Sequence, residues 1–285
     1  MNKNINNLLD KRFLTNKPDQ ITKKFMAMFL GILDGDGYIE IGPQKQYNKK
    51  TKELVKSTIR IRIVIRLHSR DIDLLKFLQS TLKAGSLSKL VKENQVRLIF
   101  YKSDIVNIIL PLITDFNLKF LTYNRNIQFL LLNHIINNRI INWEDINYIN
   151  PKYDSIPSFN LIKLSWFSDW VVGFTIAEGS FGIKTNLSAF FSIKQKGEIN
   201  YEIIKAICLI ITGRESYIIK PDSADCYQLT LTSKNDINKV LYFFTSSYSN
   251  NYPLLGYKLI QFNIWINNLK ISNRYKKISF FSSSS

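Results

Sequence analysis

The two halves of this sequence carry the same succession of patterns. Asp36-Gly37 and Glu178-Gly179 each end an apolar segment. After each pair the residues alternate between apolar and polar types, as strands do, and then show helical periodicity. Both halves therefore predict a helix, two strands, a helix, a pair of strands and two further helices. This repeat predicts two similar halves that each mix helices with antiparallel strands, an α+β fold.

A segment without clear periodicity separates the two halves. Residues 141–160 include two prolines and have mixed polarity, which is typical of a linker. We therefore expect an N-terminal repeat over residues 1–140, a linker over residues 141–160 and a C-terminal repeat over residues 161–285.

The charge of the chain indicates a polyanionic partner. Lys and Arg outnumber Asp and Glu by 39 to 22, which gives a net charge of +17. Such an excess favours nucleic acid first and an anionic membrane surface second. A basic surface without a specific partner is the alternative. The longest apolar runs are too short to cross a bilayer, and no basic amphipathic helix presents exposed aromatic residues, so we expect no membrane association.

Other features of the composition bear on the cellular compartment. Cys208 and Cys226 are too few for a disulfide framework, and reduced cysteines fit an intracellular location. Asn, Ile, Lys, Phe and Tyr are abundant, and their codons are rich in A and T. This bias favours an organelle gene and a mitochondrial location over a nuclear or cytoplasmic one.

Both apolar segments have small residues where two helices could touch. The first segment begins near Thr22, a predicted N-cap, and carries Gly31 and Gly35 one turn apart. Gly173 and Ala177 hold the same places in the second segment. Small residues at this spacing allow two helix backbones to approach closely. We therefore predict that the two helices pack along these faces, with their C-terminal ends together.

This packing would place Asp36 and Glu178 side by side. Each acid would meet the negative end of a helix dipole, and the two carboxylates would repel each other. A hard cation such as Mg²⁺ removes this conflict, and Mn²⁺ or Ca²⁺ could occupy the same sites. The free carbonyl groups near Gly35 and Ala177 could add ligands. The alternative is two exposed acids before simple glycine caps; two matched copies favour the metal site.

Residues 57–68 predict a strand with one apolar face and one basic face. Isoleucines form the apolar face, while Arg60, Arg62, Val64, Arg66 and His68 point the other way. Guanidinium groups suit phosphates and the guanine edge. Like charges two residues apart repel unless an anion covers them. We therefore favour contact with DNA over the alternative of a solvated charged face.

The same alternation places further residues on the outward faces of the predicted strands. Mixed polar side chains on a twisted sheet suit readout of the major groove. The basic loop 43–56 would contact phosphates, or form a mobile hairpin tip, or both. The remaining predicted DNA-binding residues are Tyr38, Glu40, Gly42, Gln44, Gln46, Arg97, Ser180, Gly182, Lys184, Asn186, Lys194, Gln228 and Thr230.

Two stretches of the chain resemble the signature motifs of a known family. FLGILDGDG (29–37) and VVGFTIAEG (171–179) resemble the motifs of single-chain LAGLIDADG homing endonucleases, or meganucleases. YPLLGYK and LHSRD also look like sequences of this family. The resemblance implies pseudo-twofold αββαββα repeats, with the signature helices at the interface. Two antiparallel four-stranded sheets would form a saddle over DNA, and a single chain would act as a monomer.

The resemblance also implies roles for the motif acids. The last acid of each motif, here Asp36 and Glu178, would bind the catalytic metal. The earlier acid of the motif matches Asp34, while the second copy has Ile176 at that place. In the family this position caps or packs rather than catalyses, so the second copy can lack the acid.

A polar ring around each metal site is a further implication of the resemblance. Gln195 and Lys258 match its positions in the second half and are predicted to be catalytic. In the first half the matching positions are Leu67 and Asn124. Leucine can neither donate nor accept a hydrogen bond, so we expect an asymmetric pocket and different cutting rates for the two DNA strands.

The function that the resemblance implies is that of an intron-encoded, site-specific endonuclease. It would make a metal-dependent break in both strands of a long, asymmetric DNA target and leave short 3′ overhangs. His68 and His134 are too few for histidine-based catalysis. The alternative is an RNA maturase of the same fold that assists group I intron splicing, with intron RNA as its partner. Both motif acids are present, which favours the nuclease.

Overall fold

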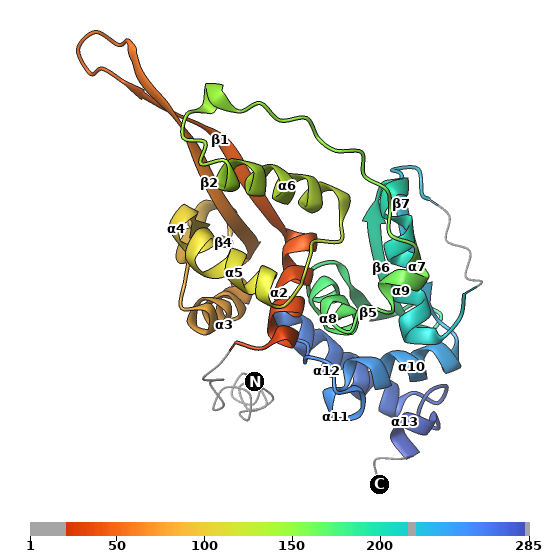
Figure 1. Ribbon diagram of the computed structural model, residues 1–285. Helices are drawn as coiled ribbons and strands as arrows, with labels where there is room; N and C mark the ends of the chain where they lie inside the picture. The colour runs from red at the N-terminus through yellow and green to blue at the C-terminus, as the bar shows by residue number, and fades with distance from the viewer. Residues whose placement is uncertain (1–20, 216–220, 283–285) are drawn as a thin grey trace.

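A central pair of helices divides the molecule into two α+β halves. The computed structural model describes residues 21–215 and 221–282. Helices α2 (Lys23–Asp36) and α8 (Phe167–Glu178) lie between two antiparallel sheets (Figure 1). Thr22 is the N-cap of α2, as predicted, and its hydroxyl accepts a hydrogen bond of 3.2 Å from the Phe25 amide.

The first half contains a four-stranded antiparallel sheet with helices on one face. The strands are β1 (Gly37–Tyr47), β2 (Leu54–His68), β3 (Ser86–Leu90) and β4 (Gln95–Tyr101). Their order in the sheet is β1-β2-β4-β3, which makes β1 an edge strand. The helical elements are α3 (Ile72–Leu82), α4 (Lys102–Asp104), the π-helix Ile105–Ile109, α5 (Leu110–Asp115) and α6 (Tyr123–Asn137).

The second half repeats this order of elements. Among the residues described, its sheet has three strands in the order β5-β6-β7: β5 (Ser180–Ile183), β6 (Ala189–Lys196) and β7 (Cys226–Leu231). A bridge between Pro221 and Tyr227 continues it, and residues 216–220 lie outside the described residues. The helices are α7 (Ser158–Leu161), α9 (Tyr201–Thr212), α10 (Lys234–Phe244), α11 (Ser246–Ser249), α12 (Gly256–Ile271) and α13 (Ser279–Ser282).

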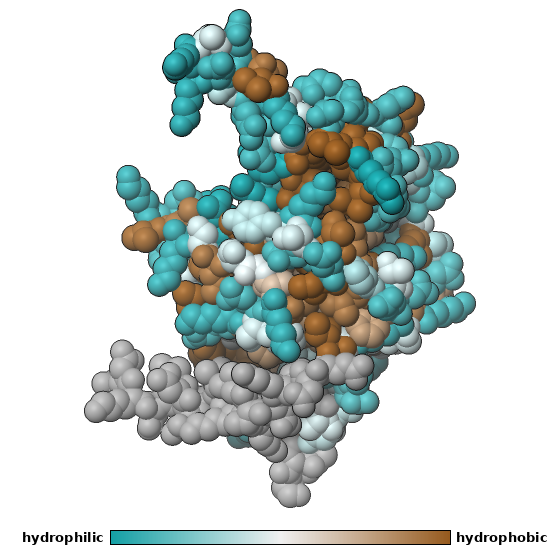
Figure 2. Space-filling view, turned by 60° about the vertical axis from the view of Figure 1, so that its left-hand side comes forward, coloured by the Kyte–Doolittle hydropathy of each residue, from teal (hydrophilic) through white to brown (hydrophobic). Residues whose placement is uncertain are grey.

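The predicted loop over residues 43–56 is mostly strand, so its predicted extent is wrong. Strand β1 continues to Tyr47 and β2 begins at Leu54, which leaves a short turn between them. Pro43 fits in β1 because an edge strand pairs on one side only. The hairpin projects from the molecule (Figure 1), and its outer surface is mostly hydrophilic (Figure 2). This segment has no alternating apolar residues, so its sequence pattern does not indicate a strand.

The segment after α6 first continues the sheet and then crosses to the second half (Figure 1). The Ile59 amide donates to the carbonyl of Ile141, at 3.1 Å, and Thr58 bridges Asn142. Strand β2 pairs with β4 only from Arg62 onward. The contacts of Thr58 and Ile59 therefore use the part of β2 that β4 does not cover. The projecting hairpin is therefore supported at its base.

The packing of α2 on α8 confirms the predicted small-residue interface. A Cβ atom at Gly31 would lie 2.2 Å from the carbonyl oxygen of Trp170. One at Gly173 would lie 1.9 Å from the carbonyl oxygen of Met28. These separations leave no room for a side chain, so glycine is required at both positions. No helix among the described residues is long and apolar enough to span a membrane.

Candidate active site at the ends of the central helices

The close packing of α2 and α8 brings two acids together at one end of the interface. Asp36 is the last residue of α2 and Glu178 the last of α8. A Cβ at Gly35 would lie 2.4 Å from the Cβ of Ala177 and 3.6 Å from Oε1 of Glu178. The Glu178 carboxylate therefore lies against the final turn of the opposite helix. Neither helix has a basic residue in its last turn.

Burial and nearby like charges disfavour the charged forms of these acids. Burial raises the pKa of Asp36 to about 6; Lys258 opposes this shift and Asp71 adds to it. Burial also raises the pKa of Glu178, and the charge of Asp36 raises it further. The interactions that set both pKa values are charge effects and burial, without hydrogen bonds to either carboxylate from the described residues. Their oxygens are available to a cation.

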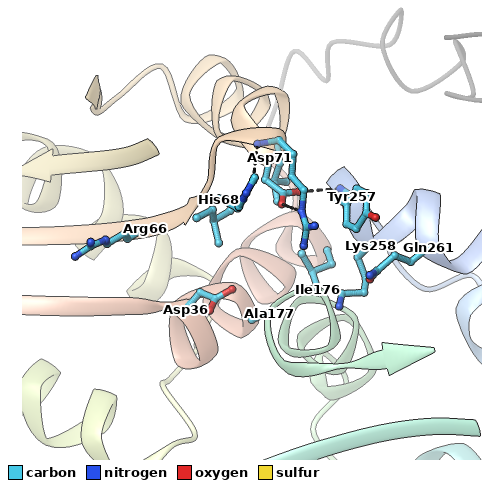
Figure 3. Close-up of a pocket in the computed structure, with 12 residues that line it drawn as sticks. Asp36, Arg66, His68, Asp71, Ile176, Ala177, Tyr257, Lys258 and Gln261 are labelled. Carbon is cyan, nitrogen blue, oxygen red and sulfur yellow. Dashed lines mark hydrogen bonds and ion pairs between the residues drawn. The ribbon is translucent and has the colours of Figure 1, made fainter. Parts of the chain in front are cut away.

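A cavity of about 190 Å³ opens beside Asp36, with walls from both halves (Figure 3). Lys258 of α12 lines it, and its ammonium group donates to the carbonyl oxygen of Gly179. Burial lowers the pKa of Lys258, whereas the charges of Asp36 and Asp71 raise it. The predicted pocket residue Leu67 lines the same cavity. The structure thus brings Asp36 and Lys258 from opposite repeats to one place.

Gln195 lies apart from this cavity. It sits in β6 opposite Tyr227 and is absent from the walls that hold Asp36 and Lys258. Its neighbour Lys194, predicted to bind DNA, lowers the pKa of Glu178 through its charge, as Lys258 also does. The grouping of Gln195 with Lys258 around one metal site stays a prediction.

Arg125 is a site residue that the sequence analysis missed. It lies in α6, and its Nε donates to the carbonyl oxygen of Leu33 at 3.0 Å. Its Nη1 donates to Gln128 at 2.9 Å. Burial lowers the pKa of Arg125, and the charges of Asp34 and Glu178 oppose that shift. The first half thus supplies a cation for Glu178. Arg125 directly follows Asn124, the position that the family resemblance implies. Its spacing of three residues from Gln128, which is helical, was the available signal in the sequence.

Asp34 is buried away from the cavity and organises the interface. Its carboxylate accepts hydrogen bonds from the amides of Leu121 (2.9 Å) and Thr122 (3.1 Å), the hydroxyl of Thr122 (2.5 Å) and the indole of Trp170 (2.8 Å). Burial raises its pKa to about 6 despite these bonds. Asp34 thereby ties the start of α6 to α8. Ile176, its counterpart, lines the cavity instead.

The arginines on the outer face of β2 have anionic partners within the protein. Arg60 forms an ion pair with Glu40 at 2.7 Å, and Arg62 lies 3.9 Å from the same carboxylate. Arg66 pairs with Glu93. The expectation that these charges stay bare without DNA is therefore wrong, because sheet neighbours distant in sequence supply the anions. Their charge alone does not require a polyanion.

All the predicted DNA-binding residues are exposed or partly exposed, but several have local roles. His68 accepts a hydrogen bond from the Arg70 amide at 3.1 Å. Lys184 and Asn186 follow the end of β5 and lie in the turn to β6, where Asn186 accepts from the Ser188 amide at 3.1 Å. Val64 is buried, contrary to the expected outward position.

The residues at the helix ends fit a magnesium ion better than a metal held by protein alone. The described residues contain no group of three or more His, Cys, Asp or Glu side chains able to hold a metal. Mg²⁺ typically uses one or two carboxylates, keeps several waters and takes further oxygens from a phosphate. Asp36 and Glu178 supply two free carboxylates, with helix-end carbonyls beside them.

Comparison with known proteins gives the family. The sequence model of the family described as "LAGLIDADG endonuclease" matches residues 29–136 and 171–269, one match in each half. "Probable intron-encoded endonuclease aI3" of Dictyostelium citrinum is 25% identical over 246 residues, which cover 83% of this chain and 92% of the relative. A protein of Schizosaccharomyces pombe, "Uncharacterized cox1 intron-2 37.2 kDa protein", is 24% identical and covers 85% of this chain and 64% of its own length.

Solved structures show the same fold. I-SmaMI "bound to uncleaved DNA target in the presence of Calcium ions" has a TM-score of 0.67 and 18% identity, with coverage of 89% of this chain and 92% of that one. The meganuclease I-CpaMI "bound to uncleaved DNA" has a TM-score of 0.64 and 17% identity, with coverage of 93% and 99%. Because the family's sequence pattern covers most of the chain in two copies, the protein belongs to the LAGLIDADG endonuclease family.

Proposed function

We propose that this LAGLIDADG endonuclease cuts both strands of a long, asymmetric double-stranded DNA site, with Mg²⁺, and leaves short 3′ overhangs. The observation that carries the proposal is the meeting of Asp36 and Glu178 at the ends of two closely packed helices, one from each half. One chain carries two related sites, one for each strand of the DNA. The protein therefore acts as a monomer.

Each residue at the helix ends has a proposed task. Asp36 and Glu178 hold the metal, with the helix-end carbonyls of Gly35 and Ala177 as further oxygen ligands. A bound Mg²⁺ supplies charge neutralisation at the scissile phosphate and lowers the pKa of the attacking water. Lys258 offers its ammonium group beside Asp36, where it can bind a phosphate oxygen or orient water.

The other site has a different set of helpers. Lys194, Lys258 and Arg125 all act on Glu178, and of these Arg125 supplies the guanidinium. Gln195, next to Lys194 in the chain, stays a predicted helper of this side. A fixed guanidinium and a flexible ammonium bind phosphate differently. The two strands are therefore cut at different rates.

The sheets and the projecting hairpin form the proposed DNA-binding surface. Its base contacts come from the outward residues of β1, β2, β5, β6 and β7, and its phosphate contacts from the basic hairpin. The two halves, over residues 1–140 and 161–285 with a linker between them, are each proposed to bind one half of the target. One relative is a cox1 intron protein, and cox1 is a mitochondrial gene, which supports a mitochondrial origin.

Cleavage selection from a random DNA library tests this function. Purified protein with Mg²⁺ should enrich one long sequence, and sequencing of the cut ends should show short 3′ overhangs. Asp36→Asn and Glu178→Gln should each reduce cutting at least a hundredfold while DNA binding persists, because both replacements keep side-chain size and remove the charge. Lack of any enriched site, or full activity of both variants, would contradict the proposal.

The same protein can be tested for the maturase alternative. A basic surface binds RNA as well as DNA, so intron RNA is a proposed second partner. If the selection yields no cleavage and the protein instead binds group I intron RNA tightly and speeds its splicing, the maturase function replaces the nuclease. If cleavage and splicing both occur, Asp36→Asn should remove only the cleavage.

A further inference from the structure

Two helices, α12 and α6, bring cations to the site. At the start of each, a backbone amide donates a hydrogen bond to a side chain of the opposite half. At the start of α12 the Tyr257 amide donates to Oδ1 of Asp71 at 2.7 Å (Figure 3). At the start of α6 the Tyr123 amide donates to Oδ1 of Asn200 at 3.0 Å. The first half thus caps a helix of the second half, and the second half caps a helix of the first.

Asp71 and Asn200 occupy matching places in the two repeats. Asp71 ends the 3₁₀ turn Ser69–Asp71 directly before α3, and Asn200 ends the 3₁₀ turn Glu198–Asn200 directly before α9. Both residues stand at the N-cap of their own helix, where Asp and Asn normally accept a hydrogen bond from that helix. Neither side chain does so here. Their side-chain oxygens serve the other repeat instead.

The surroundings of each cap hold it in place. Gly256 has a φ of +61°, and a Cβ there would lie 2.7 Å from Oδ1 of Asp71. The guanidinium of Arg70 lies 3.8 Å from the ring centre of Tyr257. On the other side, Asn200 is buried, and its Nδ2 donates to the Lys196 carbonyl at 2.8 Å. Both caps are therefore built into packed surroundings.

The capped amides lie next to the site cations in the chain. Lys258 follows Tyr257 directly, lines the cavity with Asp36 and donates to the Gly179 carbonyl. Arg125 lies two residues after Tyr123 and donates to the Leu33 carbonyl in the last turn of α2. A shift at the first turn of either helix would displace the cation, and a displacement of about 1 Å can slow a reaction about a hundredfold.

We infer that Asp71 and Asn200 are reciprocal positioning residues, which set Lys258 and Arg125 at the ends of the two central helices from the opposite repeat. This inference rests on the proposed function. It couples each site to the correct docking of both halves. It also predicts that each cap positions one cation only, because Lys258 and Arg125 lie on different helices.

Strand-specific cleavage under single-turnover conditions tests the inference. The substrate is the target obtained by selection, with the two strands carrying different labels. Asp71→Ala and Asn200→Ala should each slow cutting of at least one strand by about tenfold or more. Asp71→Asn keeps an acceptor oxygen and should restore most of the lost rate. Unchanged cutting rates for both strands in either alanine variant would overturn the inference.

Matched controls lie in the same two segments. Asp73→Ala removes an exposed acid from the first turn of α3, where its partner is Lys76. Glu198→Ala removes an exposed acid from the second 3₁₀ turn. Both controls should leave the two strand rates within twofold of the unaltered protein. A loss equal to that of the cap variants would show that any change in these turns has the same effect, and would overturn the inference.

Amide hydrogen exchange tests the caps without cleavage. In metal-free protein, Asp71→Ala should speed exchange at Tyr257 and leave Tyr123 unchanged, while Asn200→Ala should do the reverse. Unchanged exchange at both amides would overturn the caps themselves. If the unaltered protein cuts no DNA, the proposed function and the positioning role fail together, and the exchange data still decide whether the caps exist.

Discussion

At the scale of single residues, the site depends on acids that the fold keeps partly out of water. A buried carboxylate that accepts no hydrogen bond favours its neutral form, and this explains why the pKa of Asp36 lies near 6. Asp34 reaches a similar pKa with four donors around it, because it is more completely buried. The two acids of one motif therefore differ in their surroundings. Hydrogen-bond donors surround the carboxylate of Asp34, whereas the carboxylate oxygens of Asp36 accept no hydrogen bond from the described residues.

The raised pKa of Asp36 predicts a pH-dependent requirement for Mg²⁺. Below about pH 6 a proton occupies the free carboxylate, and Mg²⁺ must displace it. The Mg²⁺ concentration for half-maximal cleavage should therefore stay constant above about pH 7 and rise severalfold or more at pH 5.5. The shift in Glu178 has the same direction and should steepen the effect.

Cleavage rates over a series of Mg²⁺ concentrations at each pH provide the measurement. Saturating Mg²⁺ should restore most of the rate at pH 5.5, because the metal and the proton compete for the same oxygens. A half-maximal concentration that stays constant down to pH 5 would contradict this account. DNA binding in the absence of metal, measured at each pH, separates loss of DNA affinity from loss of metal.

At the scale of the helices, the close approach of α2 and α8 predicts a large stability penalty for the smallest added side chain. Gly31→Ala and Gly173→Ala would each drive a methyl group into a backbone carbonyl of the opposite helix. Alanine favours a helix by about 1 kcal/mol over glycine, but overpacking against rigid backbone costs about 3 kcal/mol or more. Both variants should therefore be less stable by about 2 kcal/mol, measured by urea unfolding.

Gly42→Ala is the matched control for this prediction. Gly42 lies in the edge strand β1, and the nearest atom to an added Cβ there is a guanidinium nitrogen of Arg60 at 4.0 Å. Its unfolding midpoint should stay close to that of the unaltered protein. If Gly31→Ala unfolds at the same urea concentration as Gly42→Ala, the helices approach less closely than the structure shows.

Sequence patterns predicted this helix pair because two matched copies each carried the small residues and the final acid. They could not predict the caps from Asp71 and Asn200, because neither residue differs in sequence from an ordinary helix N-cap. Arg125 was not predicted for a related reason. Its role depends on where α6 begins, and α6 begins at a contact with Asn200 of the other repeat. Contacts between repeats depend on three-dimensional docking, which local periodicity does not encode.

The sheets show the same division between local and distant information. Alternation placed the isoleucines of β2 in the core, where Ile63 and Ile65 are fully buried. It could not identify Glu40 and Glu93 as partners of the arginines, since pairing between strands decides that. The hairpin extension was missed because its strands bury almost no apolar surface, and its regular pairing comes from backbone hydrogen bonds.

At the scale of the whole molecule, a net charge of +17 predicts DNA binding that weakens steeply with salt. Each phosphate neutralised by a cation releases counterions, so the logarithm of the binding constant falls by about 0.9 per contact for each tenfold rise in salt. The projecting hairpin holds exposed lysines at its turn, Lys49, Lys50 and Lys52, which can follow the phosphate backbone beyond the sheet.

Replacement of these three lysines by glutamine should therefore flatten the salt dependence. If each contacts one phosphate, the slope should decrease by about 2.7. Specificity for the selected target over a scrambled one should persist, because phosphate contacts carry no sequence information. Lys76→Gln, on the exposed face of α3 and paired with Asp73, is the control and should leave the slope unchanged. An equal slope in the triple variant would show that the hairpin does not contact DNA, and would confine the phosphate contacts to the sheets.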